Sequence, residues 1–86
     1  MEIVIGDLFK DQLQKYPVSF QHKFRKIYQH LKVVDNPLEV KNITPSSHTK
    51  NFYKLKIDVS RIGLVVKADR LHITSFIYNQ YFDNLS

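Results

Sequence analysis

The sequence predicts an α+β domain with the element order β-α-α-β-β-β, in which two N-terminal helices pack on one face of a small antiparallel sheet. Apolar residues recur at helical spacing between residues 8 and 34. From residue 52 the apolar period changes to two, which is typical of strands with one buried face. Because 86 residues build one hydrophobic core and not two, we expect a single domain over residues 1–86.

The first strand and the first helix are short. Residues 1–5 alternate weakly and are rich in β-branched side chains, which predicts a strand that ends at Gly6. Asp7 is placed to cap a helix that continues to Tyr16, and Pro17 stops it. The apolar residues of this helix are expected on one face: Leu8, Phe9, Leu13 and Tyr16.

The second helix carries the longest apolar stripe in the chain. It begins at Val18 or Ser19, and the turn-forming residues 35–37 terminate it. Five apolar residues repeat at helical spacing: Phe20, Phe24, Ile27, Leu31 and Val34. The opposite face is basic, with Lys23, Lys26 and His30. A stripe of this kind needs a sheet to pack against.

The second half of the chain reads as strands that supply this sheet. We expect three or four strands: residues 52–59, 61–68 and 71–78, with a turn at residues 69–70, and a short strand over residues 39–43 as the optional fourth. By parity, one face receives Tyr53, Leu55, Ile57 and Val59, together with Ile62, Leu64 and Val66. The opposite face receives polar residues and is left to solvent or to a ligand.

Composition excludes several classes of protein. The chain has no Cys, which excludes a disulfide scaffold and thiolate chemistry. It has no apolar run long enough for a membrane span and no signal peptide, so we expect a cytoplasmic protein without a membrane partner. Its four His show no ligand spacing, so we expect no metal site, and no small-molecule cofactor is indicated.

Positive charge is concentrated in one segment. The net charge is +5, and residues 41–61 contribute +4 of it. An anionic partner would meet this segment first. The candidate RNA-binding residues are therefore its basic side chains: Lys41, His48, Lys50, Lys54, Lys56 and Arg61. The alternative is a solvated face whose lysines only maintain solubility.

Lys54 and Lys56 are two residues apart on a predicted strand, so their ammonium groups project from one face within roughly 7 Å of each other. This repulsion is relieved when an anion lies between them. Arg61 has the parity to join that face, and Gly63 offers backbone without a side chain. The alternative is that edge lysines guard against aggregation and that Gly63 marks a β-bulge.

Three segments carry a resemblance to a known family: Tyr53–Ile57, Ser60–Val66 and Leu71–Ile73. With the two preceding helices and the aromatic end, they resemble the RelE/ParE superfamily of bacterial type II toxin–antitoxin systems, in particular RelE/YoeB-like toxins. The resemblance covers nearly the whole chain. It implies an endoribonuclease that cuts mRNA on the ribosome without a metal, inhibits translation, and is neutralised by a cognate antitoxin.

In such enzymes the ribose 2′-OH attacks the adjacent phosphodiester, which needs a base, cations for the phosphoryl oxygens and an acid for the leaving 5′ oxygen. Lys54 and Lys56 match the paired strand cations of the family, and Arg61 matches its phosphate-binding hairpin arginine. A lysine beside another cation gives up its proton more readily and can then act as the base.

The C-terminal end departs from the family pattern. Tyr81 falls on a family tyrosine, whereas Gln80 replaces the histidine and Tyr78 replaces an arginine. Glutamine does not exchange a proton near neutral pH. The resemblance therefore implies a catalytic set of Lys54, Lys56, Arg61, Gln80 and Tyr81 with weakened acid–base chemistry. His48 is the one histidine placed to act as a substitute proton carrier.

Two alternatives stay open at this point. The first keeps the fold and removes catalysis, because ParE-like members bind DNA gyrase and a chain without the family histidine can be a binding module or a weakly active toxin. The second leaves the family and describes only a basic nucleic-acid-binding domain. The Lys54, Lys56 and Arg61 set favours the nuclease, and Gln80 favours the alternatives.

Overall fold

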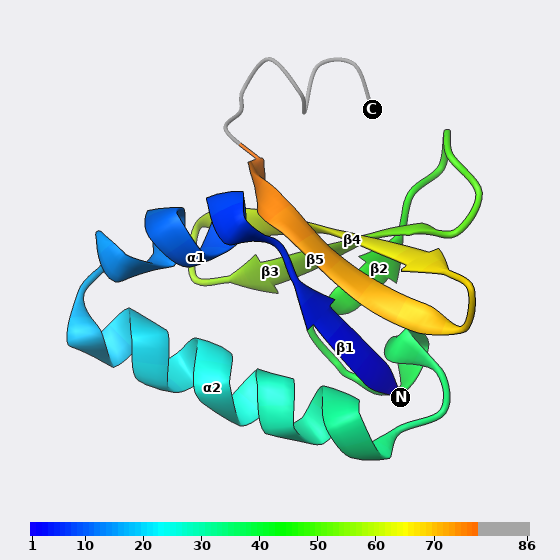
Figure 1. The fold of residues 1–86 in the computed structure, drawn as a ribbon, viewed down its shortest axis with the longest axis horizontal. Helices are drawn as coiled ribbons and strands as arrows, with labels where there is room; N and C mark the ends of the chain where they lie inside the picture. Colours follow the sequence, from blue (N-terminus) through cyan, green and yellow to red (C-terminus); the bar gives the residue numbers. More distant parts are fainter. Residues whose placement is uncertain (78–86) are drawn as a thin grey trace.

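A computed structural model describes residues 1–77, in which two helices lie against one face of a five-stranded sheet (Figure 1). The α+β prediction, with both helices on one face, is confirmed. The elements are β1 (Glu2–Ile5), α1 (Asp7–Gln14), α2 (Val18–Val33), the 3-10 helix η1 (Pro37–Glu39), β2 (Ile43–Pro45), β3 (Phe52–Ile57), β4 (Ser60–Lys67) and β5 (Arg70–Ile77).

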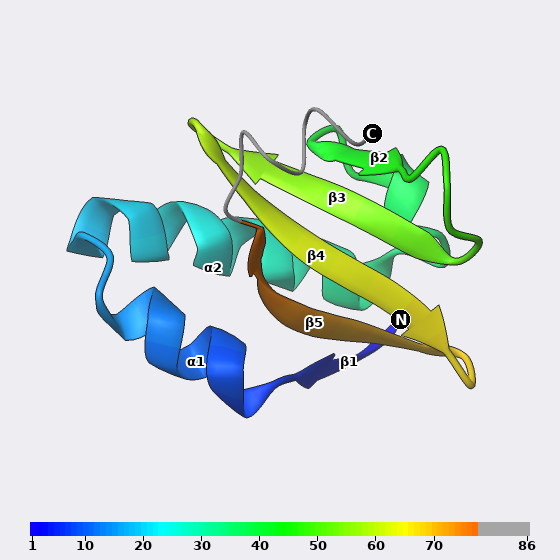
Figure 2. The same ribbon diagram turned by 90° about the horizontal axis from the view of Figure 1, so that it is seen from above.

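The sheet has the strand order β1-β5-β4-β3-β2. Strands β2 to β5 form an antiparallel meander, whereas β1 pairs with β5 in parallel, so the sheet is mixed and not wholly antiparallel as expected. The reason is the path of the chain. After β1 the helices carry it to the opposite edge, and three reversals in the meander return β5 in the direction of β1. Figure 2 shows the face that the helices leave open, with α2 behind the sheet.

The strand predicted at residues 39–43 is wrong in position, since the structure has η1 there and begins β2 later. Local hydrogen bonds explain the difference. The Asn36 side chain accepts from the Leu38 N–H at 2.9 Å, and the Glu39 carboxylate accepts from the Asn36 N–H at 3.0 Å. This reciprocal cap holds Glu39 in a helical turn, although its flanking residues favour a strand.

Helix α1 differs from the prediction at both ends. Gly6 is its N-cap, Asp7 makes no side-chain cap, and the helix ends at Gln14 and not at Tyr16. The carboxylate of Asp7 still lies in the first turn, where it complements the helix dipole. Leu8 is 60% exposed and does not join the buried face, because the sheet receives its neighbour Phe9.

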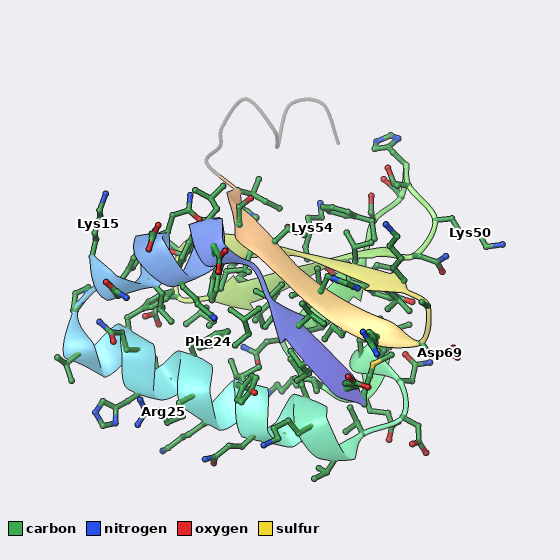
Figure 3. All side chains as sticks on the ribbon, in the orientation of Figure 1. Lys15, Phe24, Arg25, Lys50, Lys54 and Asp69 are labelled. Carbon is green, nitrogen blue, oxygen red and sulfur yellow. The ribbon has the colours of Figure 1, made fainter. Side chains whose placement is uncertain are left out.

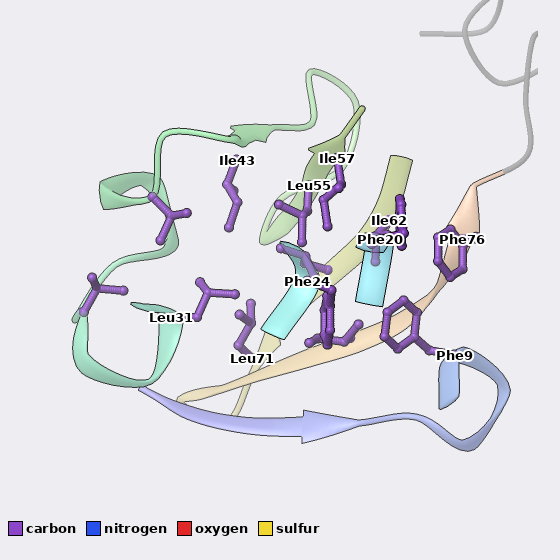
Figure 4. Close-up of a cluster of buried hydrophobic side chains, with 14 residues drawn as sticks. Phe9, Phe20, Phe24, Leu31, Ile43, Leu55, Ile57, Ile62, Leu71 and Phe76 are labelled. Atoms are coloured by element: carbon purple, nitrogen blue, oxygen red, sulfur yellow. The ribbon is translucent and has the colours of Figure 1, made fainter. Parts of the chain in front are cut away.

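Helix α2 contributes a continuous apolar stripe to the core. As its spacing predicted, Phe20, Phe24 and Leu31 are buried, and Ile27 is partly buried against them. They meet the buried face of β3, β4 and β5 (Figure 4). That face consists of Leu55, Ile57, Ile62, Leu64, Leu71, Ile73 and Phe76. Val59, expected on this face, is 90% exposed because β3 ends before it and the chain turns.

A β-bulge in β5 changes which residues face the helices. Gly63 lies opposite Ser75 and Leu64 lies opposite Ile73, so Thr74 is an extra residue. Beyond the bulge the parity is reversed, and Phe76 faces the helices in place of Ser75. The Thr74 hydroxyl donates to the Gly63 carbonyl oxygen at 3.0 Å, which holds the bulge against β4.

Phe76 anchors both helices to the end of β5. Its ring stacks on Tyr16, between the helices, with centroids 4.3 Å apart, on Phe9 of α1 at 5.1 Å, and lies tilted against Phe20 of α2 at 5.9 Å. Figure 4 shows Phe76 and Phe9 side by side at this end of the core. The backbone N–H of Phe76 donates to the Gln12 side-chain oxygen at 2.9 Å, which ties α1 to the strand.

Neither helix of the described residues is long and apolar enough to cross a membrane.

Replacement of Phe24 by Ala should lower the free energy of unfolding by about 3–5 kcal/mol, because it leaves a cavity between α2 and the sheet. The matched control is Val33→Ala on the same helix, where the side chain is 79% exposed and the expected change is within about 0.5 kcal/mol. Urea denaturation measures both. Equal stabilities for the two variants would contradict this packing.

Candidate nucleic-acid interface

The cations of β3 lie on the open face of the sheet. Leu55 and Ile57 point into the core, and Lys54 and Lys56 alternate with them. Figure 3 shows Lys54 on the side of the sheet away from α2, whereas Phe24 lies between α2 and the sheet. The strand therefore presents two ammonium groups to the same side of the molecule, with the helices on the other.

These cations line a groove of about 440 Å³ at the β2 side of the open face. Lys56 is paired with Arg61 across the hairpin, which brings the guanidinium to the same face. The lining residues, which we call the cationic groove, are Lys41, Asn42, Thr44, Lys54, Lys56, Asp58 and Arg61. Four of the six RNA-binding residues expected from the sequence are thus brought together.

The segment that leads into β2 is fixed to β3 by two hydrogen bonds. The Lys56 N–H donates to the Asn42 carbonyl oxygen at 3.0 Å, and the Asn42 side-chain nitrogen donates to the Lys56 carbonyl oxygen at 3.1 Å. Thr44 then pairs with Lys54 in the β2–β3 register. This attachment places Lys41 beside the lysines of β3. The sequence alone does not indicate that Asn42 and Thr44 line the groove, because their position depends on the pairing of β2 with β3.

The groove also contains the carboxylate of Asp58, and a lysine of α2 partly neutralises its charge. Lys23 of α2 donates to both carboxylate oxygens of Asp58, at 2.9 and 3.1 Å. Both side chains are about half exposed, so the pair contributes little to stability. Its electrical effect is local, because it partly neutralises the one acidic side chain that lines the cationic groove. The sequence placed Lys23 on a solvent face without this partner.

The remaining candidate residues lie apart from the groove or outside the described residues. His48 and Lys50 are exposed in the loop between β2 and β3 and do not line the groove. Gln80 and Tyr81 lie outside the described residues 1–77. Within those residues no three His, Asp or Glu side chains are grouped closely enough to hold a metal ion.

Gly63 does not leave open backbone, and that expectation is wrong. A Cβ at this position would lie 3.0 Å from the Thr74 hydroxyl oxygen and 3.3 Å from Cζ of Phe52. The glycine is buried because these side chains cover it. The alternative, that Gly63 marks a bulge, is confirmed by the register shift between Gly63 and Leu64.

Comparison with known proteins identifies the fold. No protein-family model matches the chain, and no curated protein matches it. The structure is similar to a chain in the crystal structure of the RelB–RelE antitoxin–toxin complex from Methanococcus jannaschii, with a TM-score of 0.77 and 14% sequence identity. The match covers 95% of this chain and 96% of that chain. The chain therefore shares the fold of a protein from a toxin–antitoxin complex.

Replacement of Lys23 by Ala should weaken binding of single-stranded RNA about twofold to fivefold, because the groove then loses the ion pair that partly neutralises Asp58. Lys26→Ala is the matched control, since it removes the same charge from an exposed position of α2. Asp58→Asn should strengthen binding and abolish the effect of Lys23→Ala. Fluorescence anisotropy at low salt measures these affinities, and equal losses for the two lysines would refute the proposed offset.

Proposed function

We propose that this protein is a RelE-like toxin of a type II toxin–antitoxin system, a single domain that binds mRNA in the cationic groove on the ribosome and cleaves it without a metal. The observation that carries the proposal is the clustering of Lys54, Lys56 and Arg61 in one groove on the open face. The similarity in fold to a chain from a RelB–RelE complex supports it. The site of action would be the cytoplasm.

The chemistry follows from the groups that the groove offers. Attack of the ribose 2′ oxygen forms a bond to phosphorus and breaks the bond to the 5′ oxygen, so negative charge accumulates on the phosphoryl oxygens. Lys54, Lys56 and Arg61 would stabilise this charge, since preorganised cations act most strongly where charge develops. One of the two lysines, in its neutral form, would accept the 2′ proton and so become a cation as the charge on the phosphoryl oxygens develops.

The leaving 5′ oxygen needs a proton, and here the chain departs from the family pattern. Tyr81 is the group with a transferable proton that the resemblance places at this step, and Gln80 offers hydrogen bonds alone. A missing general acid typically lowers a rate by ~10²–10⁴-fold. We therefore propose a slow nuclease and not an inert protein.

The proposed protein partner is a cognate antitoxin of acidic character. The structural neighbour comes from an antitoxin–toxin complex. The net charge of this chain is +5, which favours acidic segments as partners. Helix α2 alone contains four Lys or Arg and no Asp or Glu: Lys23, Arg25, Lys26 and Lys32. An antitoxin segment that crosses these side chains would be held by their charge.

A second candidate function keeps the fold and removes catalysis. The specific observation in its favour is Gln80, which occupies the position of the family's proton-carrying histidine. In this alternative the cationic groove binds nucleic acid, or the fold binds DNA gyrase, without cleavage. The two functions differ in one outcome, namely whether the message is cut.

Incubation with translating ribosomes should give slow mRNA cleavage, read by primer extension. Lys54→Ala and Lys56→Ala should each lower the rate about 10²-fold, because each removes a cation that faces the phosphoryl oxygens. Lys10→Ala, an exposed lysine on α1, is the matched control and should not change it. Gln80→His should raise the rate, and Tyr81→Phe should lower it.

A different result of the same assay would contradict the nuclease activity. If the wild type and Gln80→His both leave the message intact while the protein still binds RNA or gyrase, the enzymatic proposal fails. The non-catalytic function then takes its place.

A further inference from the structure

An aromatic ring lies on the open face beside the cationic groove. Phe52 is the first residue of β3, and its parity places it with Lys54 and opposite to Tyr53, which packs against the core. Its side chain is half-buried although no helix of the described residues covers this face. Phe52 is absent from the core and belongs to the same surface as the cations.

The ring extends sideways over the next strand. Phe52 pairs with Val65 in the β3–β4 register, yet its Cζ atom would be 3.3 Å from a Cβ at Gly63, two residues before Val65 on β4. The ring therefore crosses diagonally onto the glycine, which is paired with Lys54. Any larger residue at position 63 would displace it. One side of the ring rests on the sheet, and its exposed part lies on the face to which Lys54 projects.

We propose that Phe52 is the base-stacking residue of this surface, on which one RNA base lies while its phosphate is held by Lys54 and the cationic groove. The inference rests on the proposed function and deepens it, because the cations alone would bind any polyanion. Lys54 and Phe52 are two residues apart on one strand face, roughly 7 Å, so a single nucleotide can contact both. A ring beside a cationic groove is the combination that single-stranded nucleic acids require.

The charge of the surface selects this occupant over an apolar one. Beyond Phe52 the cationic groove contains Lys41, Lys54 and Lys56, so an apolar segment laid over it would take their charges out of water at a cost in free energy. A nucleotide satisfies both parts, since it has an anionic phosphate and an aromatic base. Every base has an aromatic face that can stack, so Phe52 would recognise single-stranded RNA without a preference for its sequence.

Two oligomers of equal length and charge test this inference: a fluorescently labelled single-stranded RNA and the same ribose-phosphate chain without bases. Wild-type protein should bind the RNA roughly 5- to 150-fold more tightly, the ratio that stacking of one base provides. Phe52→Leu should abolish this ratio without changing the affinity for the abasic chain, because it keeps an apolar cover over Gly63 and removes the aromatic face. Phe52→Tyr should preserve the ratio.

Two controls separate stacking from charge and from folding. Lys54→Gln with Lys56→Gln should weaken binding of both oligomers and lower the slope of log affinity against log salt by about 1.4, at ~0.7 per phosphate contact. Tyr28→Leu makes a comparable aromatic-to-leucine change in the helix layer and should leave the ratio unchanged. Phe52→Tyr guards against misfolding, because it retains the ring.

Each outcome is decisive. A wild-type preference for RNA that survives in Phe52→Leu overturns the stacking role. Equal affinity of the wild type for both oligomers also overturns it and leaves the groove proposal intact. If neither oligomer binds, both the groove proposal and the stacking role fail.

Discussion

The extra residue Thr74 in β5 sets the arrangement of both faces of the sheet. Without it, β5 would present Ser75 to the helices and Phe76 to solvent, because side chains alternate strictly along a regular strand. With it, Phe76 enters the core and contacts the rings of Phe9 in α1 and Phe20 in α2, so both helices are held at one end of the strand. The Thr74 hydroxyl, bonded to the Gly63 carbonyl oxygen, fixes the bulge at this place.

The same bulge connects the core to the proposed binding surface. Thr74 and Phe52 both cover Gly63 on the open face, and the absence of a side chain there lets the two strands and the ring lie close together. The lysines of β3 follow directly beside that ring. An aromatic ring and a row of cations on one sheet face are the parts with which proteins bind single-stranded nucleic acid, and one strand supplies most of them.

The sequence predicted what single elements determine and missed what pairs of strands determine. The stripe from Phe20 to Leu31 and the shared face of Lys54 and Lys56 follow from the periods of one helix and one strand. A bulge at Gly63 was one of two alternatives from the sequence, but its extra residue Thr74 and the Lys23–Asp58 pair depend on register or on contacts between layers, which no local period reports. The parallel pairing of β1 was missed because it depends on the path of the whole chain. The position of β2 was missed because a cap between Asn36 and Glu39 holds the preceding residues in a helical turn.

The central claim is that RNA binds the open face of the sheet and not the basic outer face of α2. Titration of ¹⁵N-labelled protein with a short single-stranded RNA tests it most directly, because amide chemical shifts report each position separately. The account predicts that shifts concentrate at residues 52–56 and 61–63, on β3 and β4, while Lys26 and His30 on α2 stay unchanged. Shifts concentrated at Lys26 and His30, with residues 52–56 unaffected, would contradict it.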